Sequence, residues 1–406
     1  MDAAAIERPA ADRPASAPHV DILDGVRGLA IALVMWYHIW EITWQGASFT
    51  LFGRTYDFIF IGRMGFVGVE IFFFVSGFCL FWPYARALAT KRPLPTVKHF
   101  AYRRFIKIVP SYLLALTILV ALGSERGRSL EDGIKDVVSH VFFVHTWFQS
   151  YFGSIDGVLW SLGVEVQFYV IFPLVVLAFA RWPVMTAATM SLVAFVWRYA
   201  VERCCATGAF NHFHLLENNL PAYLDLFAIG MLGAWLIAVV LPRLDVTFIT
   251  RIAGTVVGIG GFAWIVALIW NVNSTSYLRD YAEHWQVWNR FPFGVALLVA
   301  TVGSIAAFPL WHKIVANRLL VFLSVISYNA YIWHQLVARA LLSAHVPNPA
   351  TPDPHGDTNW QIIALPLYLL AGIAVASALT YGFERPLLRM RPKVGFPWRS
   401  RASAEA

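Results

Sequence analysis

Charged residues are scarce in this sequence: they make up 14% of its 406 residues, whereas 58% are hydrophobic. A soluble globular domain carries about 25% charged residues, so a single soluble domain is excluded and a polytopic membrane protein is indicated. Cysteine is equally scarce, with only Cys79, Cys204 and Cys205. The adjacent pair is poorly placed for an ordinary disulfide. Because no Cys or His spacing is typical of a metal site, we expect no bound metal.

Ten apolar stretches are long enough to cross a bilayer, which takes about 20 residues. The sequence therefore predicts an all-α, polytopic membrane protein of about ten transmembrane helices, with both termini on one side. A further stretch, 137–150, is too short and too polar to span, and we expect it to lie in the membrane interface or to fold back. The predicted spans are 26–44, 65–84, 107–123, 159–180, 183–201, 220–241, 249–271, 291–308, 319–343 and 361–382.

Lys and Arg are distributed unevenly over the two sides of this arrangement. The loops on the side of the termini hold 21 of them and the opposite side holds 10, counting 198 and 290 among the latter. Because cytoplasmic loops carry the excess, we expect cytoplasmic termini and a multi-pass protein of the cell inner membrane. This sorting accounts for the net charge of +7, so we expect no nucleic-acid partner.

The domain organisation that we expect is simple. Residues 1–19 form a flexible cytoplasmic tail without the apolar core of a cleaved signal peptide. Residues 20–391 form one membrane domain, and 392–406 form a basic cytoplasmic tail. No internal repeat is visible, which argues against a carrier built from inverted repeats.

The stretch GVLWSLGVEVQFYVIFP, from Gly157 to Pro173, places Glu165 and Gln167 inside an apolar helix beside Trp160 and Ser161. A carboxylate within a membrane helix costs roughly 2.5–3.5 kcal/mol on insertion scales and needs a partner or a function. The alternative is that Glu165 lies at the water boundary and is paired there.

The first helix carries Asp24, Arg27 and His38. Arg27 and His38 are 11 residues apart, so they share a helix face and lie about 16 Å apart along the axis. With Arg27 at the cytoplasmic boundary, His38 lies near mid-membrane. A buried histidine is often only a hydrogen-bonded core residue, yet histidine is also the side chain best suited to proton exchange near neutral pH.

Other polar residues interrupt the later spans. Small residues such as Ser76 permit close helix contact, but this does not explain Glu70, for which an interfacial position is the alternative. Aromatic belts explain part of the pattern at Tyr328 and Tyr331, but they do not explain Asp225 or His334. Three cations mark the entry of the third span, where they serve as positive-inside anchors, as a phosphate clamp, or as both: Arg103, Arg104 and Lys107.

Six stretches resemble, in order, the motifs of the membrane-bound acyltransferase family three, the bacterial O-acetyltransferases of surface polysaccharides and other glycosides. The resemblance runs from about residue 21 to 391, nearly the whole chain. Any one match is weak, but six in order at similar spacing are specific. The stretches are LDGVRGLAIALVMWYH, FVGVEIFFFVSGFCLF, RRFIKIVPSY, LWSLGVEVQFYVIFP, SYNAYIWHQ and FERPLLR.

Three positions depart from the family pattern. Glu70 stands where the family usually has Asp, and Val166 replaces the second residue of a Glu pair, which leaves Glu165 as the only carboxylate there. Lys107 replaces an arginine, with the loss of a bidentate fork for phosphate. We also expect a member without the additional esterase-like domain that some relatives carry.

The resemblance implies transfer of an acyl group, usually acetyl, from cytoplasmic acyl-CoA to a hydroxyl of an extracytoplasmic carbohydrate or glycoside. It implies that His38 is a general base or a transient acyl carrier, oriented by Glu165. The phosphates of the coenzyme would be held by Arg27, Arg103, Arg104 and Lys107. Further polar residues are expected to contact substrate or support the site: Asp24, Glu70, Ser76, Trp160, Ser161, Gln167, Asp225, Tyr328 and His334.

Two other functions remain open at this point. One is a proton-coupled transporter or flippase of a polysaccharide precursor, whose buried charges would relay protons; the other is a membrane sensor without chemistry. The acceptor is also open, between exopolysaccharide, lipopolysaccharide O-antigen, peptidoglycan and a small glycoside. The sequence does not decide between acetyl and another acyl group, between direct transfer and a covalent intermediate, or between a monomer and a homo-oligomer.

Overall fold

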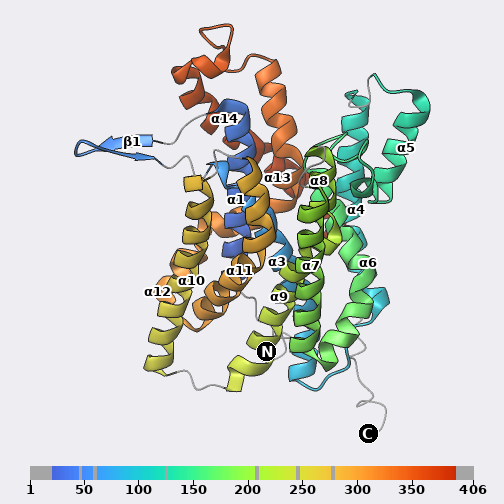
Figure 1. Ribbon diagram of the computed structural model, residues 1–406, viewed down its shortest axis with the longest axis vertical. Helices are drawn as coiled ribbons and strands as arrows, with labels where there is room; N and C mark the ends of the chain where they lie inside the picture. Colours follow the sequence, from blue (N-terminus) through green and yellow to red (C-terminus); the bar gives the residue numbers. More distant parts are fainter. Residues whose placement is uncertain are drawn as a thin grey trace, which may run out of the picture.

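The computed structural model describes residues 21–44, 48–57, 62–123, 127–205, 210–243, 247–275 and 279–389. The two predicted tails therefore lie outside the described residues. Within these ranges, ten helices are long and apolar enough to cross a membrane, which confirms the predicted number and the all-α fold class. Figure 1 shows these helices packed side by side with their long axes roughly upright.

The long helices are α1 (Asp21–Thr43), α3 (Val67–Ala89), α4 (Val97–Ala121), α6 (Leu159–Arg181), α7 (Pro183–Cys205), α9 (Leu224–Trp235), α10 (Phe248–Thr275), α11 (Arg279–Ala306), α13 (Arg318–Ser343) and α14 (Thr358–Leu379). A π-turn extends α9 (η3, Leu236–Val240) and another extends α14 (η6, Thr380–Glu384). The shorter elements are β1 (Ser48–Leu51), β2 (Arg54–Asp57), α5 (Leu130–Val141), η1 (His145–Trp147), α8 (Phe210–Glu217), η2 (Leu220–Tyr223), η4 (Leu241–Arg243), α12 (Pro309–Val315), η5 (Pro354–Gly356) and α15 (Arg385–Arg389).

Two helices begin ten or more residues earlier than predicted. α4 begins at Val97 rather than at 107, with the side chain of Thr96 accepting a hydrogen bond from the backbone N–H of His99 at 3.3 Å. α11 begins at Arg279 rather than at 291. An apolar run measures the part of a helix that crosses hydrocarbon, whereas the hydrogen-bonded backbone continues through charged turns. The cations near the start of α4 therefore lie on a helix face and not in a loop.

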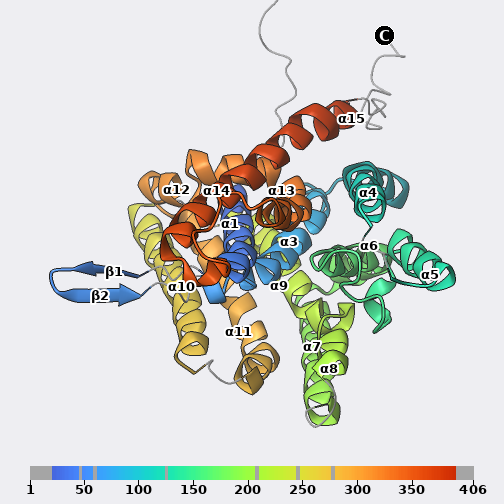
Figure 2. The same ribbon diagram turned by 90° about the horizontal axis from the view of Figure 1, so that it is seen from above.

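Helix α1 lies at the centre of the bundle, as the view from above shows (Figure 2). It packs most closely against α13 and α3; α3 in turn packs on α9, and α13 on α14. Spans 1 and 9, which are α1 and α13, run in the same direction, so positions equally far along the two helices lie at the same depth. We call the side where α1 begins the inner side and the opposite side the outer side.

Glycines bring the central helices into backbone contact. A Cβ atom at Gly28 of α1 would lie 1.9 Å from the carbonyl oxygen of Leu320, at the start of α13. One at Gly77 of α3 would lie 2.2 Å from the carbonyl oxygen of Phe227 in α9. Because lipid tails are as apolar as the helix surfaces, no hydrophobic force drives helices together in a membrane. The helices are instead stabilised by the van der Waals packing that such close approach allows. These contacts fix how α1 faces α13 and how α3 faces α9.

Two short units lie outside the ten long helices. The antiparallel β1–β2 hairpin follows α1, and it is the small exception to the all-α fold in the described chain. The predicted interfacial stretch belongs to α5 and η1, and α5 is too short to span. Its apolar side chains at every third or fourth position are exposed, from Leu130 and Ile134 to Val138 and Val141, while Asp136 is buried.

Candidate functional site

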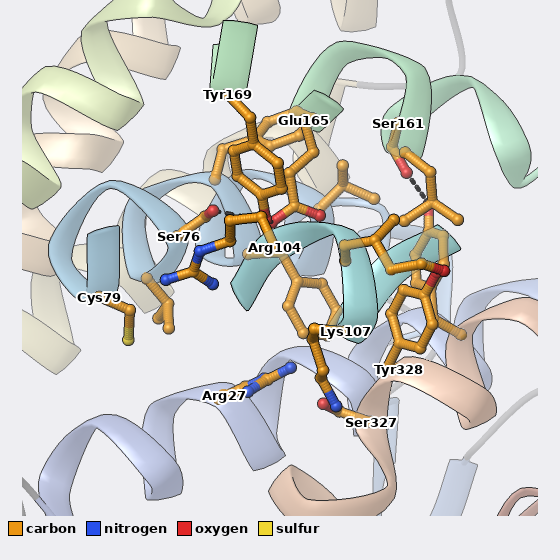
Figure 3. A pocket seen from close by; sticks show the side chains of 17 residues that line it. Arg27, Ser76, Cys79, Arg104, Lys107, Ser161, Glu165, Tyr169, Ser327 and Tyr328 are labelled. Carbon is orange, nitrogen blue, oxygen red and sulfur yellow. Dashed lines mark hydrogen bonds between the residues drawn. The ribbon is translucent and has the colours of Figure 1, made fainter. Parts of the chain in front are cut away.

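A cavity opens between α1, α3, α4, α6 and α13 (Figure 3). Its volume is about 760 Å³, counting the space open to solvent at its mouth. The five helices come from both halves of the chain, and the Gly28 contact described above holds two of them, α1 and α13, together. Its polar lining is formed by Arg27, Ser76, Cys79, Arg104, Lys107, Ser161, Glu165, Tyr169, Ser327, Tyr328 and Tyr331.

Three of the four predicted phosphate-binding cations line this cavity. Arg27 comes from α1, and Arg104 and Lys107 come from the start of α4. Arg104 and Lys107 are three positions apart, so they share a helix face. Arg103 points about 100° away from Arg104 around the helix; it is exposed and is not among the residues that line the cavity. All three lining cations lie near the inner ends of their helices.

Glu165 of α6 lines the same cavity, near Ser76, Tyr169 and Arg104 (Figure 3). Its Oε1 accepts hydrogen bonds from the hydroxyl of Ser76 at 2.7 Å and from that of Tyr169 at 2.5 Å. Ser76 therefore does more than permit close packing, since it donates to this carboxylate. The guanidinium of Arg104 lies 5.6 Å from the centroid of the Tyr169 ring. The charge of Glu165 is thus held in place from α3 and α6.

Tyrosines of α13 form the wall of the cavity. The hydroxyl oxygen of Tyr331 lies 2.5 Å from that of Ser161, and the Tyr328 hydroxyl donates to the backbone carbonyl of Ile108 at 2.8 Å. Both rings are buried, so an aromatic belt at the membrane surface does not explain them. The centroid of the Tyr331 ring lies 6.2 Å from that of His334. The cavity therefore ends one side chain short of His334.

His38 of α1 and His334 of α13 lie next to each other at the same depth, with Nδ1 of His38 2.9 Å from Nε2 of His334. Nδ1 of His334 is 2.8 Å from the carbonyl oxygen of Ala330. A carbonyl oxygen only accepts, so this nitrogen carries the proton, and in a neutral ring Nε2 then accepts. Nδ1–H of His38 therefore donates to Nε2 of His334. The same nitrogen also lies 3.1 Å from the carbonyl oxygen of Val34. The lone pair of His38 is left on Nε2, where a general base needs it.

The structure does not bring Glu165 and His38 together as a hydrogen-bonded pair, although the sequence analysis expected this pairing. The hydrogen bonds of Glu165 go to Ser76 and Tyr169, whereas the ring of His38 bonds His334. Glu165 lines the cavity, and His38, which is half-buried, is not among the lining residues. The pattern of one polar residue per span does not show which spans are neighbours, which is why the sequence favoured the carboxylate over the second histidine.

Gln167 and the loop before α6 brace the outer part of the site. Nε2 of Gln167 donates to the carbonyl of Phe143 at 2.8 Å, and the indole N–H of Trp147 donates to its Oε1 at 3.1 Å. The stacked rings of His140 and His145, 3.9 Å between centroids, are fully buried in this loop. Burial, followed by the neighbouring His140, lowers the pKa of His145 to about 3. Gln167 is thus a support of α6 outside the cavity.

Two further predicted residues, Asp24 and Trp160, lie outside the cavity. Asp24 of α1 accepts a hydrogen bond from Ser324 of α13 at 3.2 Å, which ties these helices together on the inner side. Trp160 of α6 is half-buried, and its ring lies 5.8 Å from that of Tyr223 and 6.4 Å from that of Phe73, a lining residue. Trp160 therefore packs behind the cavity wall.

A second polar cluster was not predicted as a unit. Arg198 of α7 donates to Oδ2 of Asp225 at 2.7 Å, and Nε of Arg290 of α11 lies 3.6 Å from Oε1 of Glu70. Nη2 of Arg290 lies 3.7 Å from Oε1 of Glu217. All five side chains are at most 3% exposed. The Glu70 carboxylate is therefore enclosed within the bundle beside Arg290 of α11 and not exposed at the surface of the protein.

Arg198 and Arg290 were counted with the outer loops, and that assignment is wrong for both. Each lies inside a helix and is fully buried. Removing them from the outer side makes the excess of Lys and Arg on the inner side larger. An arginine inside an apolar stretch needs a partner, so the sequence alone indicates that Arg198 is paired. The sequence does not indicate which carboxylate pairs with it.

The fold and the site together define a class: a membrane-embedded helical bundle with an internal cavity, cationic at its inner end and close to a histidine pair. Comparison with known families agrees with this class. Residues 20–383 match the family model described as an acyltransferase domain. The chain therefore belongs to acyltransferase family 3.

The chain is also similar to curated bacterial O-acetyltransferases. The chain is 25% identical over 354 residues to the peptidoglycan O-acetyltransferase OatA of Listeria monocytogenes, covering 79% of this chain and 49% of that protein. It is 22% identical over 333 residues to the O-acetyltransferase OatA of Staphylococcus aureus, covering 77% of this chain and 49% of the relative. The chain thus spans about half the length of these relatives. No solved structure matches it.

Proposed function

We propose that this protein is an O-acyltransferase of the bacterial inner membrane that passes an acyl group from cytoplasmic acyl-CoA to a hydroxyl of an extracytoplasmic carbohydrate. The observation that carries the proposal is the order of groups along one path. Cations lie at the inner end of the cavity, Glu165 follows, and Tyr331 leads on to the histidine pair. This order matches a donor that is anionic at one end and carries a thioester at the other.

The donor is held at its anionic end. Arg27, Arg104 and Lys107 bind the phosphates of acyl-CoA, since guanidinium and ammonium groups pair with phosphate oxygens. The acyl end extends along the tyrosine-lined wall toward Tyr331. With the predicted orientation, the cations face the cytoplasm, where acyl-CoA is present, and His38 is reached from the outer side. Acetyl is the acyl group that the names of the relatives favour.

The chemistry requires a base at His38. In direct transfer, Nε2 of His38 takes the proton of the acceptor hydroxyl, and the oxygen attacks the thioester carbonyl. The C–S bond breaks, and the thiolate of CoA takes the proton back from His38. The positive charge that His38 carries in between is shared with His334 through their hydrogen bond. General-base catalysis of this kind contributes about 10²–10⁴-fold in rate.

The same lone pair on Nε2 also suits a second route, in which His38 attacks the thioester and briefly carries the acyl group. Both routes leave the same products and need the same tautomer. The acceptor belongs to the class of surface glycans. Peptidoglycan is named for the Listeria monocytogenes relative, and a muropeptide with free hydroxyl groups is the acceptor to test first.

The proposal is tested by release of CoA thiol from acetyl-CoA in membranes that contain the expressed chain, with and without a muropeptide or polysaccharide acceptor. We expect acceptor-dependent thiol release that His38→Ala lowers by at least 100-fold. Undiminished release in this variant would refute the role of His38. Solute movement coupled to pH without consumption of acetyl-CoA would instead support the transporter or flippase.

Arg104 and Arg103 form a matched pair for the donor site. Both are arginines on the same turn of α4, but only Arg104 lines the cavity. Arg104→Ala is expected to raise the KM for acetyl-CoA at least 10-fold, whereas Arg103→Ala changes it less than about 3-fold. Equal effects of the two substitutions would show that the cavity is not the donor site and that these cations only anchor the helix.

A further inference from the structure

A carboxylate outside the cavity is paired with one of the lining cations. Nζ of Lys107 on α4 forms an ion pair with Oε1 of Glu384, at the end of the π-turn η6. The Glu384 side chain is only 5% exposed, whereas that of Lys107 is 24% exposed. Lys107 lines the cavity and Glu384 is not among the lining residues. The ammonium therefore lies between a buried carboxylate and the cavity.

Glu384 is anchored independently of Lys107. Its second oxygen, Oε2, accepts a hydrogen bond from Nδ2 of Asn329 at 2.8 Å, and the same nitrogen donates to Oγ1 of Thr380 at 2.9 Å. Thr380 and Asn329 are both fully or almost fully buried. The π-turn places Thr380 and Glu384 together beside Asn329 of α13. The carboxylate thus keeps its position and one hydrogen-bond donor when the ammonium moves.

The side chain of Lys107 is flexible enough to leave Glu384 for an anion in the cavity. An ammonium on a four-carbon stem is a compact charge with three donors, free to rotate, unlike the fixed fork of an arginine. Nζ lies 5.4 Å from the centroid of the Tyr328 ring, a lining residue whose electron-rich face favours the cation along its path.

We propose that Glu384 is the counter-ion that Lys107 exchanges for a phosphate of the bound donor. This inference rests on the proposed function, because it gives Glu384 the role of controlling how tightly the protein binds CoA. Before binding, the ion pair with Glu384 lowers the positive potential that the cavity offers to anions. After transfer, Glu384 competes with the phosphates of CoA for Lys107 and promotes release of the product. Glu384 is a positioning residue, since it touches neither the substrate nor the reacting atoms.

The exchange makes a prediction that a merely structural ion pair does not make. Glu384→Gln keeps the size of the side chain and an oxygen that accepts from Asn329, but it removes the charge that competes with phosphate. We expect CoA to bind 3- to 10-fold more tightly to this variant, measured by calorimetry on the full chain in nanodiscs. Glu384→Asp, which keeps the charge, is the matched control and is expected to bind CoA no more tightly than the wild type.

If Glu384 acts through Lys107, the tighter binding of CoA by Glu384→Gln requires Lys107. Lys107→Gln is expected to weaken CoA binding at least 5-fold, and adding Glu384→Gln to it should change the affinity by less than 2-fold. The same series is made with pyrophosphate, an anion without the acyl arm. In the transfer assay, product inhibition by CoA should become stronger in Glu384→Gln in proportion to its tighter binding.

The outcomes separate the two proposals. Weaker or unchanged binding of both CoA and pyrophosphate to folded Glu384→Gln would overturn the exchange and leave the acyltransferase proposal standing. If the wild type binds pyrophosphate but not CoA, the acyltransferase proposal fails, and the pyrophosphate series alone decides the exchange. Should Glu384→Gln not fold, Glu384→Ala removes the same charge, and its failure to tighten pyrophosphate binding would overturn the exchange.

Discussion

Nε2 of His334 lies 2.9 Å from Nδ1 of His38, on two parallel helices that a glycine contact holds together. Because the other nitrogen of His334 donates to the carbonyl of Ala330 at 2.8 Å, the protonation of the whole pair follows from one backbone group. The hydrogen bond fixes the tautomer of His38 and the direction of its ring. This is the task that a carboxylate performs in many hydrolases, here performed by a neutral imidazole.

Replacement of His334 tests this arrangement. His334→Leu leaves Nδ1–H of His38 without its side-chain acceptor, so we expect a 10- to 100-fold loss of kcat with little change in the KM for acetyl-CoA. His334→Gln places an amide oxygen near the position of Nε2, and it should recover part of the loss. Equal kcat values in the Leu and Gln variants would show that His334 acts only by filling space.

The carboxylate of Glu165 is the second group to test. Glu165→Gln removes a charge that lies between the cations and the histidine pair, while both hydroxyl donors find an amide oxygen in its place. We expect a 10- to 100-fold lower kcat/KM for acetyl-CoA. Ser76→Ala removes one of the two hydrogen bonds to Oε1 and is expected to lower kcat/KM only 2- to 5-fold. Wild-type kcat/KM in Glu165→Gln would remove Glu165 from the mechanism.

The buried ion pair of Arg198 and Asp225 makes a prediction about stability. Asp225→Ala leaves the guanidinium of Arg198 buried without its carboxylate, which typically costs about 3–5 kcal/mol. Unfolding of the purified protein in mixed micelles, followed by titration with a denaturing detergent, measures this loss. The exposed pair Lys135 and Glu131 gives the control, because Glu131→Gln is expected to change stability by less than about 1 kcal/mol. Similar losses in both variants would contradict the structural role of the buried pair.

Burial of His145 makes the stability of the folded protein depend on pH. Burial lowers its pKa to about 3 in the folded protein, whereas the unfolded chain has the ordinary value of 6.5. Above pH 6.5 the two states bind the same number of protons at this site, so it does not favour unfolding. Between pH 6.5 and 3 only the unfolded state takes up the proton, and the free energy of unfolding falls by up to about 1.4 kcal/mol per pH unit.

The variant His145→Gln should therefore lose less stability than the wild type when the pH is lowered from 7 to 5. Thermal unfolding at several pH values measures this difference. His345→Gln replaces an exposed histidine and should keep the wild-type dependence on pH. An identical pH dependence in wild type and His145→Gln would show that His145 is protonated in the folded protein as readily as in the unfolded chain.

The sequence by itself determined the number of spans and most of the polar residues that matter. An apolar run of about 20 residues has few alternatives to a membrane helix, because every backbone polar group in lipid needs an internal partner. For the same reason a charged or imidazole side chain inside such a run is conspicuous. Glu165, His38, Asp225 and His334 were found in this way. Helical spacing also placed Arg27 and His38 on one face of α1.

Only the tertiary structure decided the partners. Residues on different helices meet according to which helices are neighbours and at what depth, and a hydropathy pattern contains neither. The glycine contact between α1 and α13 brings His334 to His38, so the partner of His38 is not Glu165. The rotation of α4 about its axis separates Arg104 from Arg103. The π-turn η6 that extends α14 carries Glu384 to Lys107, 277 residues away in sequence.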